Sequence, residues 1–278
     1  MGRDEQGMPT LATHQVCALH ADGQLCVATA EDVPAEHILN VHANDRALMR
    51  LVCTATDLPE LVVGRLYSEG MIESVDEIDS MDFSDDQSEV HLELGAAARP
   101  WRARAMEFVP SATTGSRVFV ERTSRPPAQG SVVPIPWCPA DIFSLARVFA
   151  ADSPMHRSTM GVHSCYLARG SEVLCRCEDL GRHNAFDKII GFALLNRIDL
   201  TVCTVFSSGR LPVDMISKAV QAGIPVVASK SVTTDHAIKL ARRTDLTLIC
   251  SAWPDSMRVY HDPAGCARSG KASRSICA

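Results

Sequence analysis

The chain has 278 residues and a net charge of −6, and 46% of its residues are hydrophobic while 22% are charged. These values are typical of a globular protein with one large domain or two modest ones, and the acidic charge argues against a protein that holds nucleic acid through phosphate contacts. No apolar run is long enough to span a membrane, and residues 1–6 are too polar for a signal peptide, so we expect a cytoplasmic protein.

The first part of the chain predicts a small mixed α/β domain over residues 31–124, preceded by a flexible tail. Residues 38–54 nearly alternate in hydrophobicity around a central Asn-Asp pair, which favours a β-hairpin. A helix is predicted between Asp57 and Gly70, because the segment has an apolar stripe at helical spacing and a proline in its first turn.

Residues 125–139 are rich in proline and predict a connection between two domains. The second domain is expected over residues 140–262, with a flexible tail at 263–278. It begins with a helix near Asp141. Strands and helices then alternate, which indicates an α/β fold with parallel strands and helices packed on the sheet. We expect these strands at residues 173–177, 202–206, 226–228 and 246–250.

The predicted strand ends of the second domain carry polar and basic residues. Ligands of such sheets bind beyond the carboxyl ends of the strands, and helix N-termini there favour anions. We therefore predict a site for a phosphate-containing ligand, with charge-assisted hydrogen bonds from Arg182, His183, Arg210 and Lys230.

Simpler roles remain open for several neighbouring residues. The pair Glu178-Asp179 can cap the following turn, and Asp187-Lys188 is expected to be a solvated pair on a helix. His163 and His183 are expected to be hydrogen-bonded structural groups rather than metal ligands.

Eleven cysteines are an unusually high number for a chain that is neither short nor loop-rich. The two closest are Cys175 and Cys177, whose sulfurs would share one face of a strand. We expect reduced cysteines and no zinc site, because the usual ligand spacing is missing.

Residues 178–188 read Glu-Asp-Leu-Gly-Arg-His-Asn-Ala-Phe-Asp-Lys. This segment resembles the Glu-Asp-Val-Gly-Arg-His-Asn-Ala-Val-Asp-Lys block of the formate dehydrogenase accessory sulfurtransferase family (FdhD), in which the chain would be a divergent sulfur carrier protein. Shorter segments that resemble the family lie at residues 61–72, 161–164, 208–210 and 218–226. The resemblance extends over most of residues 31–262.

The resemblance implies a cytidine-deaminase-like, three-layer second domain, a smaller mixed first domain (α+β overall) and a homodimer. It also implies transfer of sulfur from a cysteine desulfurase to the molybdenum bis-molybdopterin guanine dinucleotide cofactor of formate dehydrogenase. A guanine nucleotide would serve as a surrogate ligand. The cofactor-binding residues implied are His163, Glu178, Asp179, Gly181, Arg182, His183, Asn184, Ser208, Gly209, Arg210, Lys230, Ser251, Ala252, Trp253, Pro254, Asp255 and Ser256.

One family feature is missing. The family's mobile loop reads Ser-Ser-Cys-Gly-x-Cys-Gly, and in the matching residues 112–118 the two cysteine positions hold Thr114 and Arg117. A threonine hydroxyl cannot carry sulfane sulfur, because a persulfide requires a nucleophilic thiolate.

Two hypotheses follow. As an enzyme, the protein would relay sulfur through a substitute thiol, for which Cys165 and Cys177 are the best candidates and Cys138 is a third. As a binding or chaperone protein, it would hold the cofactor without sulfur transfer. In both cases Trp253 replaces a basic residue of the family and could stack on a guanine or pterin ring.

Overall fold

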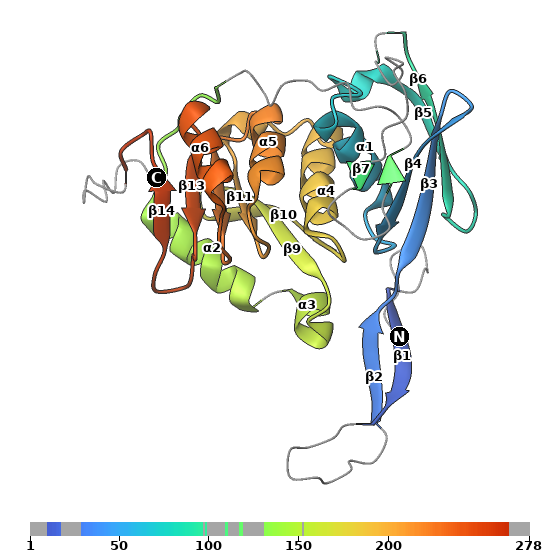
Figure 1. Cartoon of the computed structure of the whole chain (residues 1–278), viewed down its shortest axis with the longest axis horizontal. Helices are drawn as coiled ribbons and strands as arrows, with labels where there is room; N and C mark the ends of the chain where they lie inside the picture. The colour runs from blue at the N-terminus through green and yellow to red at the C-terminus, as the bar shows by residue number, and fades with distance from the viewer. Residues whose placement is uncertain are drawn as a thin grey trace.

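The computed structural model describes residues 10–17, 29–96, 98, 109–110, 117–118, 131–151 and 153–266. It is a mixed α/β structure with two six-stranded sheets and a two-stranded ribbon. The two sheets belong to two domains that lie side by side, with helices α1 and α4 between them (Figure 1). In these parts of the chain, none of the helices is long and apolar enough to cross a membrane.

The first sheet has the strand order β5-β6-β3-β4-β8-β7. Its strands are β3 (His37–Ala43), β4 (Arg46–Cys53), β5 (Ile78–Phe83), β6 (Glu89–Leu94), β7 (Val109–Pro110) and β8 (Arg117–Val118). Strands β3 and β4 form the expected hairpin, and both Asn44 and Asp45 at its tip have positive φ angles, 46° and 63°. A two-residue turn with this backbone matches the right-handed twist of the strands.

Helix α1 (Leu58–Ser68) covers one face of the first sheet, and a 3₁₀ turn, η1 (Val75–Glu77), precedes β5. The expected bounds of α1 are confirmed, since the helix begins after Asp57 and the chain turns at Gly70 with φ 70°. Apolar side chains of α1 pack on the buried residues of β3 and β4, and the side chains on the other face of β3 and β6 are exposed or half-buried.

Strands β1 (Leu11–Val16) and β2 (Thr29–Pro34) form an antiparallel ribbon that projects away from the first sheet (Figure 1). The expectation of a flexible tail over residues 1–30 is therefore wrong for residues 11–16 and 29–30. Most side chains of the ribbon are exposed on both faces, so its sequence lacks the alternation that reveals a strand packed on a core.

The second sheet has the order β10-β9-β11-β12-β13-β14. Its strands are β9 (His163–Arg169), β10 (Glu172–Asp179), β11 (Thr204–Ser207), β12 (Val226–Ser229), β13 (Thr247–Cys250) and β14 (Arg258–His261). Only β11, β12 and β13 are parallel neighbours, and β9 runs antiparallel to both β10 and β11. The expected parallel pairing is thus wrong for the first strand, because β9 and β10 form a hairpin and β11 pairs with β9 instead of β10.

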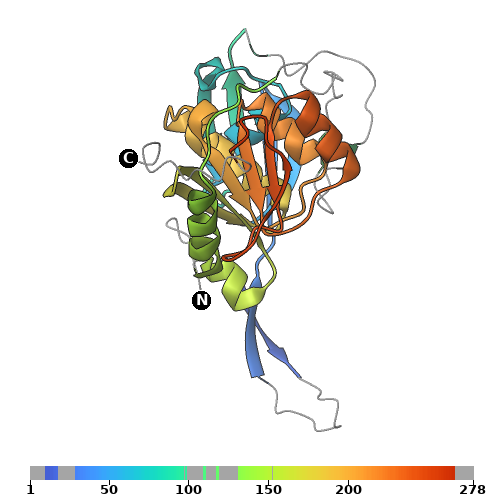
Figure 2. The same ribbon diagram turned by 90° about the vertical axis from the view of Figure 1, so that its left-hand side faces the viewer.

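Helices cover both faces of the second sheet, which makes three layers (Figure 2). Helix α2 (Pro139–Ala151) covers one face, and α3 (Pro154–Thr159) follows it. Helices α4 (Arg182–Leu195), α5 (Val213–Gln221) and α6 (Asp235–Arg243), with the 3₁₀ turn η2 (Leu200–Val202), lie on the other. Residues 131–138, the end of the expected connection, already pack on this domain, where the indole of Trp137 donates to Asp262 at 2.9 Å.

Helices α1 and α4 join the two domains at two glycines. A Cβ atom on Gly64 would collide with the carbonyl group of Asp187, and one on Gly191 would collide with the carbonyl group of Glu60. The absence of both side chains lets the two helix backbones touch.

Candidate functional site

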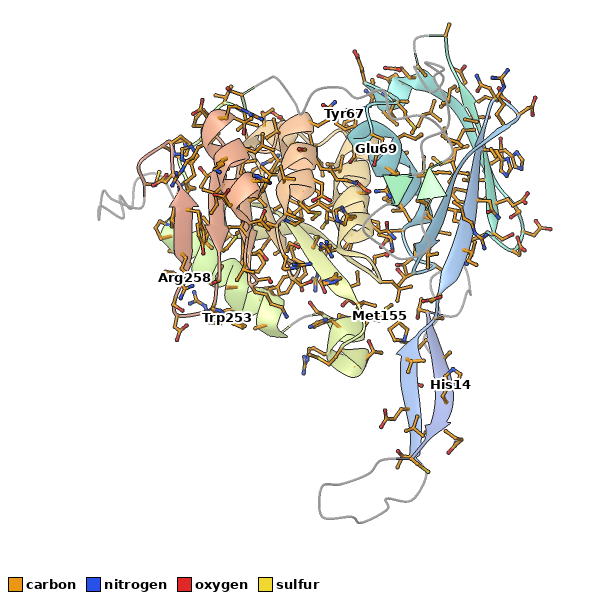
Figure 3. All side chains as sticks on the ribbon, in the orientation of Figure 1. His14, Tyr67, Glu69, Met155, Trp253 and Arg258 are labelled. Atoms are coloured by element: carbon orange, nitrogen blue, oxygen red, sulfur yellow. The ribbon has the colours of Figure 1, made fainter. Side chains whose placement is uncertain are left out.

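The carboxyl ends of β10, β11, β12 and β13 lie at one edge of the second sheet. Strand β10 runs in the same direction as β11, since β9 between them is antiparallel to both. The residues that follow these strands therefore meet at this edge as expected, together with the start of β9 and helix α3. Met155 of α3 and Trp253 after β13 mark its extent in Figure 3.

His163 and Ser208 are in direct contact at this edge. The Nδ1 atom of His163 lies 3.1 Å from the Oγ atom of Ser208, and Ser208 Oγ also accepts a hydrogen bond from the backbone N–H of Ser164 at 3.0 Å. The start of β9 is thereby fixed to the end of β11.

Basic side chains surround His163. Burial lowers the pKa of His163, and the neighbouring side chains of Arg182, His156 and Lys230 lower it further. Lys230 Nζ lies 3.3 Å from His156 Nε2, while His156 Nδ1 lies 2.6 Å from the carbonyl oxygen of Val162. The carbonyl requires a proton on Nδ1, so Nε2 is the acceptor for Lys230. The charges of Arg182 and Lys230 create a positive potential that suits an anion, and the two imidazoles add hydrogen-bonding groups.

Arg182 has an unused donor at this edge. Its Nε atom is buried and has no hydrogen-bond acceptor among the residues that the structure describes. A buried polar atom without a partner is rare and calls for an explanation, such as a ligand. Gly209 lies against the same side chain, because a Cβ atom there would come within 2.9 Å of Arg182 Cβ and 3.4 Å of His163 Nδ1.

Glu178 bonds to residues that precede it in the chain, so it does not cap the turn that follows it as expected. Its carboxylate accepts the backbone N–H groups of Met155 and His156 at 3.0 and 2.9 Å, and the hydroxyl of Ser164 at 3.2 Å. Glu178 therefore caps the first turn of α3 and holds His156 in place.

Asp179, Asn184 and Lys188 form a buried network that reaches the first domain. Lys188 Nζ lies 2.8 Å from Asp179, and both side chains are fully buried. Asp179 also accepts hydrogen bonds from the backbone N–H of Thr54 at 3.1 Å and of Gly181 at 3.0 Å, and from Asn184 at 2.8 Å. Asp179 therefore caps the turn after β10, as suggested by the sequence. It also binds the residue that follows β4, which the sequence did not indicate.

Asp187 forms a second buried network. It contacts Arg65 of α1 at 2.9 Å, Ser68 of α1 at 2.7 Å and Lys218 of α5 at 2.6 Å. The expectation that Asp187-Lys188 is a solvated pair is wrong, because both side chains are fully buried and each has its own partners. Adjacent helix positions point in different directions, so Asp187 and Lys188 can take part in two separate networks.

His183 points toward α5. Its Nε2 atom lies 3.4 Å from Asp214 Oδ2, and the side chain is buried. Burial lowers the pKa of His183 to about 3, and the charge of Lys218 acts in the same direction, so the imidazole is neutral near pH 7. Arg210, the other basic residue predicted for the site, is exposed just after β11.

The loop of residues 251–256 lies beside the end of β12. The backbone N–H groups of Ser251 and Ala252 donate to the carbonyl groups of Ser231 and Ser229, at 2.7 and 2.9 Å. The Trp253 side chain is 50% exposed. The loop is closed by a hydrogen bond from the Trp253 N–H to the Ser256 carbonyl, and by contacts from Arg147 to the Pro254 carbonyl and from Ser256 to Asp255.

The model of the FdhD/NarQ family matches residues 34–266. The chain belongs to this family. It is 30% identical over 245 residues to the sulfur carrier protein FdhD of Staphylococcus haemolyticus, covering 88% of this chain and 92% of that protein. It is 28% identical over 258 residues to the sulfur carrier protein FdhD of Halalkalibacterium halodurans, covering 92% and 95%.

A solved structure has the same fold. It is a crystal structure described as a formate dehydrogenase accessory protein from Desulfotalea psychrophila. The two structures superpose with a TM-score of 0.72 at 25% sequence identity, covering 92% of this chain and 99% of that one. The membership of the FdhD/NarQ family inferred from residues 178–188 is thus confirmed.

The loop that would carry sulfur in an FdhD protein falls largely outside the described residues. Thr114 is outside them, and Arg117 is described only as a backbone position of β8, opposite Arg50 of β4. Neither residue supplies a thiol.

The substitute thiols are buried. Burial raises the pKa of Cys165 to about 12, and its Sγ donates to Ser207 Oγ at 3.4 Å. A hydrogen bond with Cys175, whose sulfur lies 3.7 Å away, and burial raise the pKa of Cys177. Both shifts disfavour the thiolate that attacks a persulfide. Cys138 is half-buried at the start of α2.

Proposed function

We propose that this FdhD/NarQ chain binds the molybdenum bis-molybdopterin guanine dinucleotide cofactor at the carboxyl edge of its second sheet and serves in the maturation of formate dehydrogenase. The observation that carries the proposal is the cluster of Arg182, Lys230, His156 and His163 around one edge, with the buried Nε–H of Arg182 free to donate. The names of the relatives, sulfur carrier proteins and a formate dehydrogenase accessory protein, support the same assignment.

The residues at the edge fit the chemistry of this cargo. The cofactor carries pyrophosphates, whose oxygens accept hydrogen bonds from guanidinium and ammonium groups. Helix α4 begins at Arg182 without a side-chain cap, so its first backbone N–H groups also suit an anion. The half-exposed Trp253 would offer a ring face to a guanine or pterin.

Replacing Arg182 or Arg210 by alanine should weaken the binding of GDP, a surrogate for the guanine dinucleotide. We expect a loss of at least ~1 kcal/mol in binding free energy for each variant, because each would remove a charge-assisted hydrogen bond. Isothermal titration calorimetry of the full chain measures this loss directly.

The matched control for this experiment is Arg197→Ala. Arg197 follows the other end of α4 and is 76% exposed, with a surface ion pair to Asp76. Its loss should leave the affinity unchanged. Equal affinities for the Arg182, Arg210 and unaltered proteins, or no binding at millimolar GDP, would count against the cofactor site.

Sulfur transfer is the second part of the proposal. A cysteine desulfurase donates sulfane sulfur to a thiolate, and neither Thr114 nor Arg117 offers one. We therefore infer that the chain holds the cofactor without a persulfide on this loop. The buried states of Cys165 and Cys177 support the binding hypothesis over a relocated relay.

Incubation with a cysteine desulfurase and labelled cysteine should leave the unaltered protein without a stable persulfide, as measured by mass spectrometry of its peptides. The variant with Thr114→Cys and Arg117→Cys should acquire label within residues 108–122. Stoichiometric persulfide on Cys165, Cys177 or Cys138 of the unaltered protein would show instead that the thiol has moved and that the chain is a sulfurtransferase.

Further parts of the proposal concern the setting of the protein. They are a homodimer, a cytoplasmic location, a cytidine-deaminase-like second domain and contacts with a cysteine desulfurase and with formate dehydrogenase or a related molybdoenzyme. They rest on the family resemblance.

A further inference from the structure

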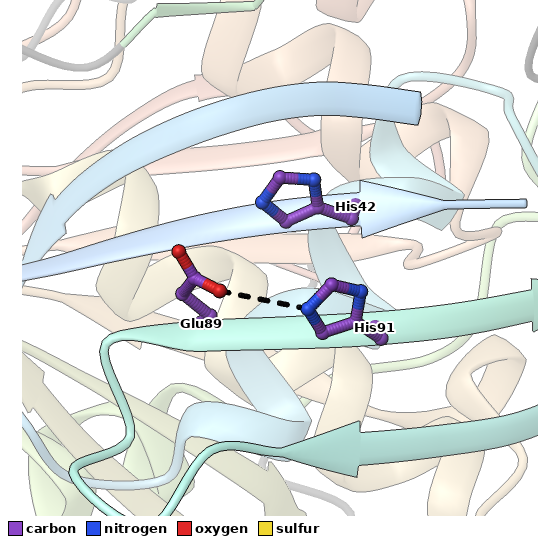
Figure 4. A group of neighbouring side chains, drawn as sticks. All are labelled: His42, Glu89 and His91. Carbon is purple, nitrogen blue, oxygen red and sulfur yellow. Dashed lines mark ion pairs between the residues drawn. The ribbon is translucent and has the colours of Figure 1, made fainter. Parts of the chain in front are cut away.

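Two histidines lie side by side on the exposed face of the first sheet. His42 of β3 and His91 of β6 are direct partners in parallel pairing, and Glu89 precedes His91 by two positions. Residues on alternate positions of a strand share a face, so all three side chains point away from the core formed by Val41 and Val90. Figure 4 shows the three side chains together above β3 and β6.

The imidazole rings of His42 and His91 are stacked, with centroids 4.8 Å apart and planes inclined by 12°. Glu89 Oε2 lies 3.6 Å from His91 Nε2. One nitrogen of each ring and one carboxylate oxygen all lie within 4.8 Å of one another.

We propose that His42, His91 and Glu89 bind a divalent transition-metal ion such as nickel or zinc, with the remaining positions taken by water. Imidazole nitrogens and a carboxylate oxygen are suitable ligands for these ions. Zinc–ligand bonds of about 2.0–2.1 Å place tetrahedral ligands roughly 3.4 Å apart, so for zinc the three side chains need to close by about 1.4 Å at most. Glu89 and His91 are exposed and His42 is half-buried, so small rotations about χ1 and χ2 can close the gap.

A second carboxylate lies next to His91 on this face. Asp82 of β5 is the direct partner of His91 in antiparallel pairing and is exposed on the same face. Its carboxylate lies on the opposite side of His91 from β3 and adds negative charge beside the imidazole. The site is on the first domain, away from the basic edge of the second sheet, and it is independent of the proposed cofactor site.

Titration of the full chain with nickel(II), followed by calorimetry, tests the proposal. One ion should bind, and His42→Ala and His91→Ala should each weaken binding by about tenfold or more, because each removes one of two imidazole ligands. Glu89→Gln, which keeps the shape and removes the charge, should weaken it by a smaller factor. Far-UV circular dichroism and the thermal midpoint establish that each variant is folded.

Two controls separate this site from other metal-binding groups. His236→Ala removes an exposed imidazole on α6 of the second domain and should bind nickel as the unaltered protein does. Cys175→Ser breaks the pair of sulfurs that lie 3.7 Å apart and should also have no effect. The proposal is overturned if no ion binds, if the His42 and His91 variants bind as tightly as the unaltered protein, or if only the Cys175 variant loses the ion.

Discussion

Replacing Asp187 by alanine is expected to lower the free energy of unfolding by about 3–5 kcal/mol, because it leaves buried cations without their partner. The side chain of Asp187 is fully buried, and those of Arg65 and Lys218 are 1% and 8% exposed. Burial acts against the charge of Arg65, but Asp187 and Glu69 outweigh it and raise the pKa of Arg65. Burial lowers the pKa of Lys218, and Asp187 opposes that shift. Urea titration followed by circular dichroism measures the loss.

The control for Asp187 is Asp235→Ala. Asp235 pairs with Lys239 on the surface of α6, where both side chains are about 70% exposed (72% and 67%). Solvent screens such a pair, so the urea midpoint should not change measurably. Asp187→Asn should fall between the two, since it keeps a hydrogen-bond acceptor and loses the charge. Similar midpoints for all three variants would refute the view that the network stabilises the fold.

Replacing Gly64 by alanine is expected to cost roughly 3 kcal/mol, at the upper end of the usual penalty for overpacking. A Cβ atom there would lie 2.6 Å from the carbonyl carbon of Asp187 and 2.8 Å from the backbone nitrogen of Gly191. Both atoms belong to the backbone of α4, so no side chain can rotate away and the two helices would have to separate. The urea midpoint should fall, and Gly191→Ala should have a similar effect.

Gly95→Ala serves as the control for the helix contact. The nearest atoms to a Cβ on Gly95 are the carboxylate oxygens of Asp79, at 3.6 and 3.7 Å, which is ordinary contact. The Gly95→Ala variant should therefore unfold at nearly the same urea concentration as the unaltered protein. If Gly64→Ala were as stable as Gly95→Ala, the close approach of α1 and α4 would not describe the protein in solution.

The local elements were predictable from the sequence where the pattern has a local cause. The hairpin at Asn44-Asp45 and the bounds of α1 follow from turn and helix-end chemistry, and both are confirmed. The meeting of strand ends at one edge was also predictable, because it depends only on the direction of β10 to β13. The order of the strands was not, because β9 was not among the expected strands and β11 pairs with it instead of with β10.

The buried charges could not be predicted for a different reason. Asp187 binds Arg65, which lies 122 positions away along the chain, and Asp179 binds Thr54, which lies 125 positions away. Sequence patterns over one or two helix turns cannot reveal partners so far away in the chain. A charged pair on a helix is also usually solvated, which favoured the wrong prediction. The clue in the sequence was Arg65 itself, a charge between the apolar residues Val63 and Leu66 of a helix whose face is buried.

The contact between α1 and α4 has a consequence for the order of events as the chain is made. The residues of α1 are synthesised early, but the surface around Gly64 and Arg65 is covered only by residues of α4, more than 110 positions later. Loop closure over that distance has to precede the gain from the contact. Until α4 has been synthesised, the side of α1 that contacts it stays uncovered. We expect the nascent chain to be prone to aggregation and to bind chaperones during this interval.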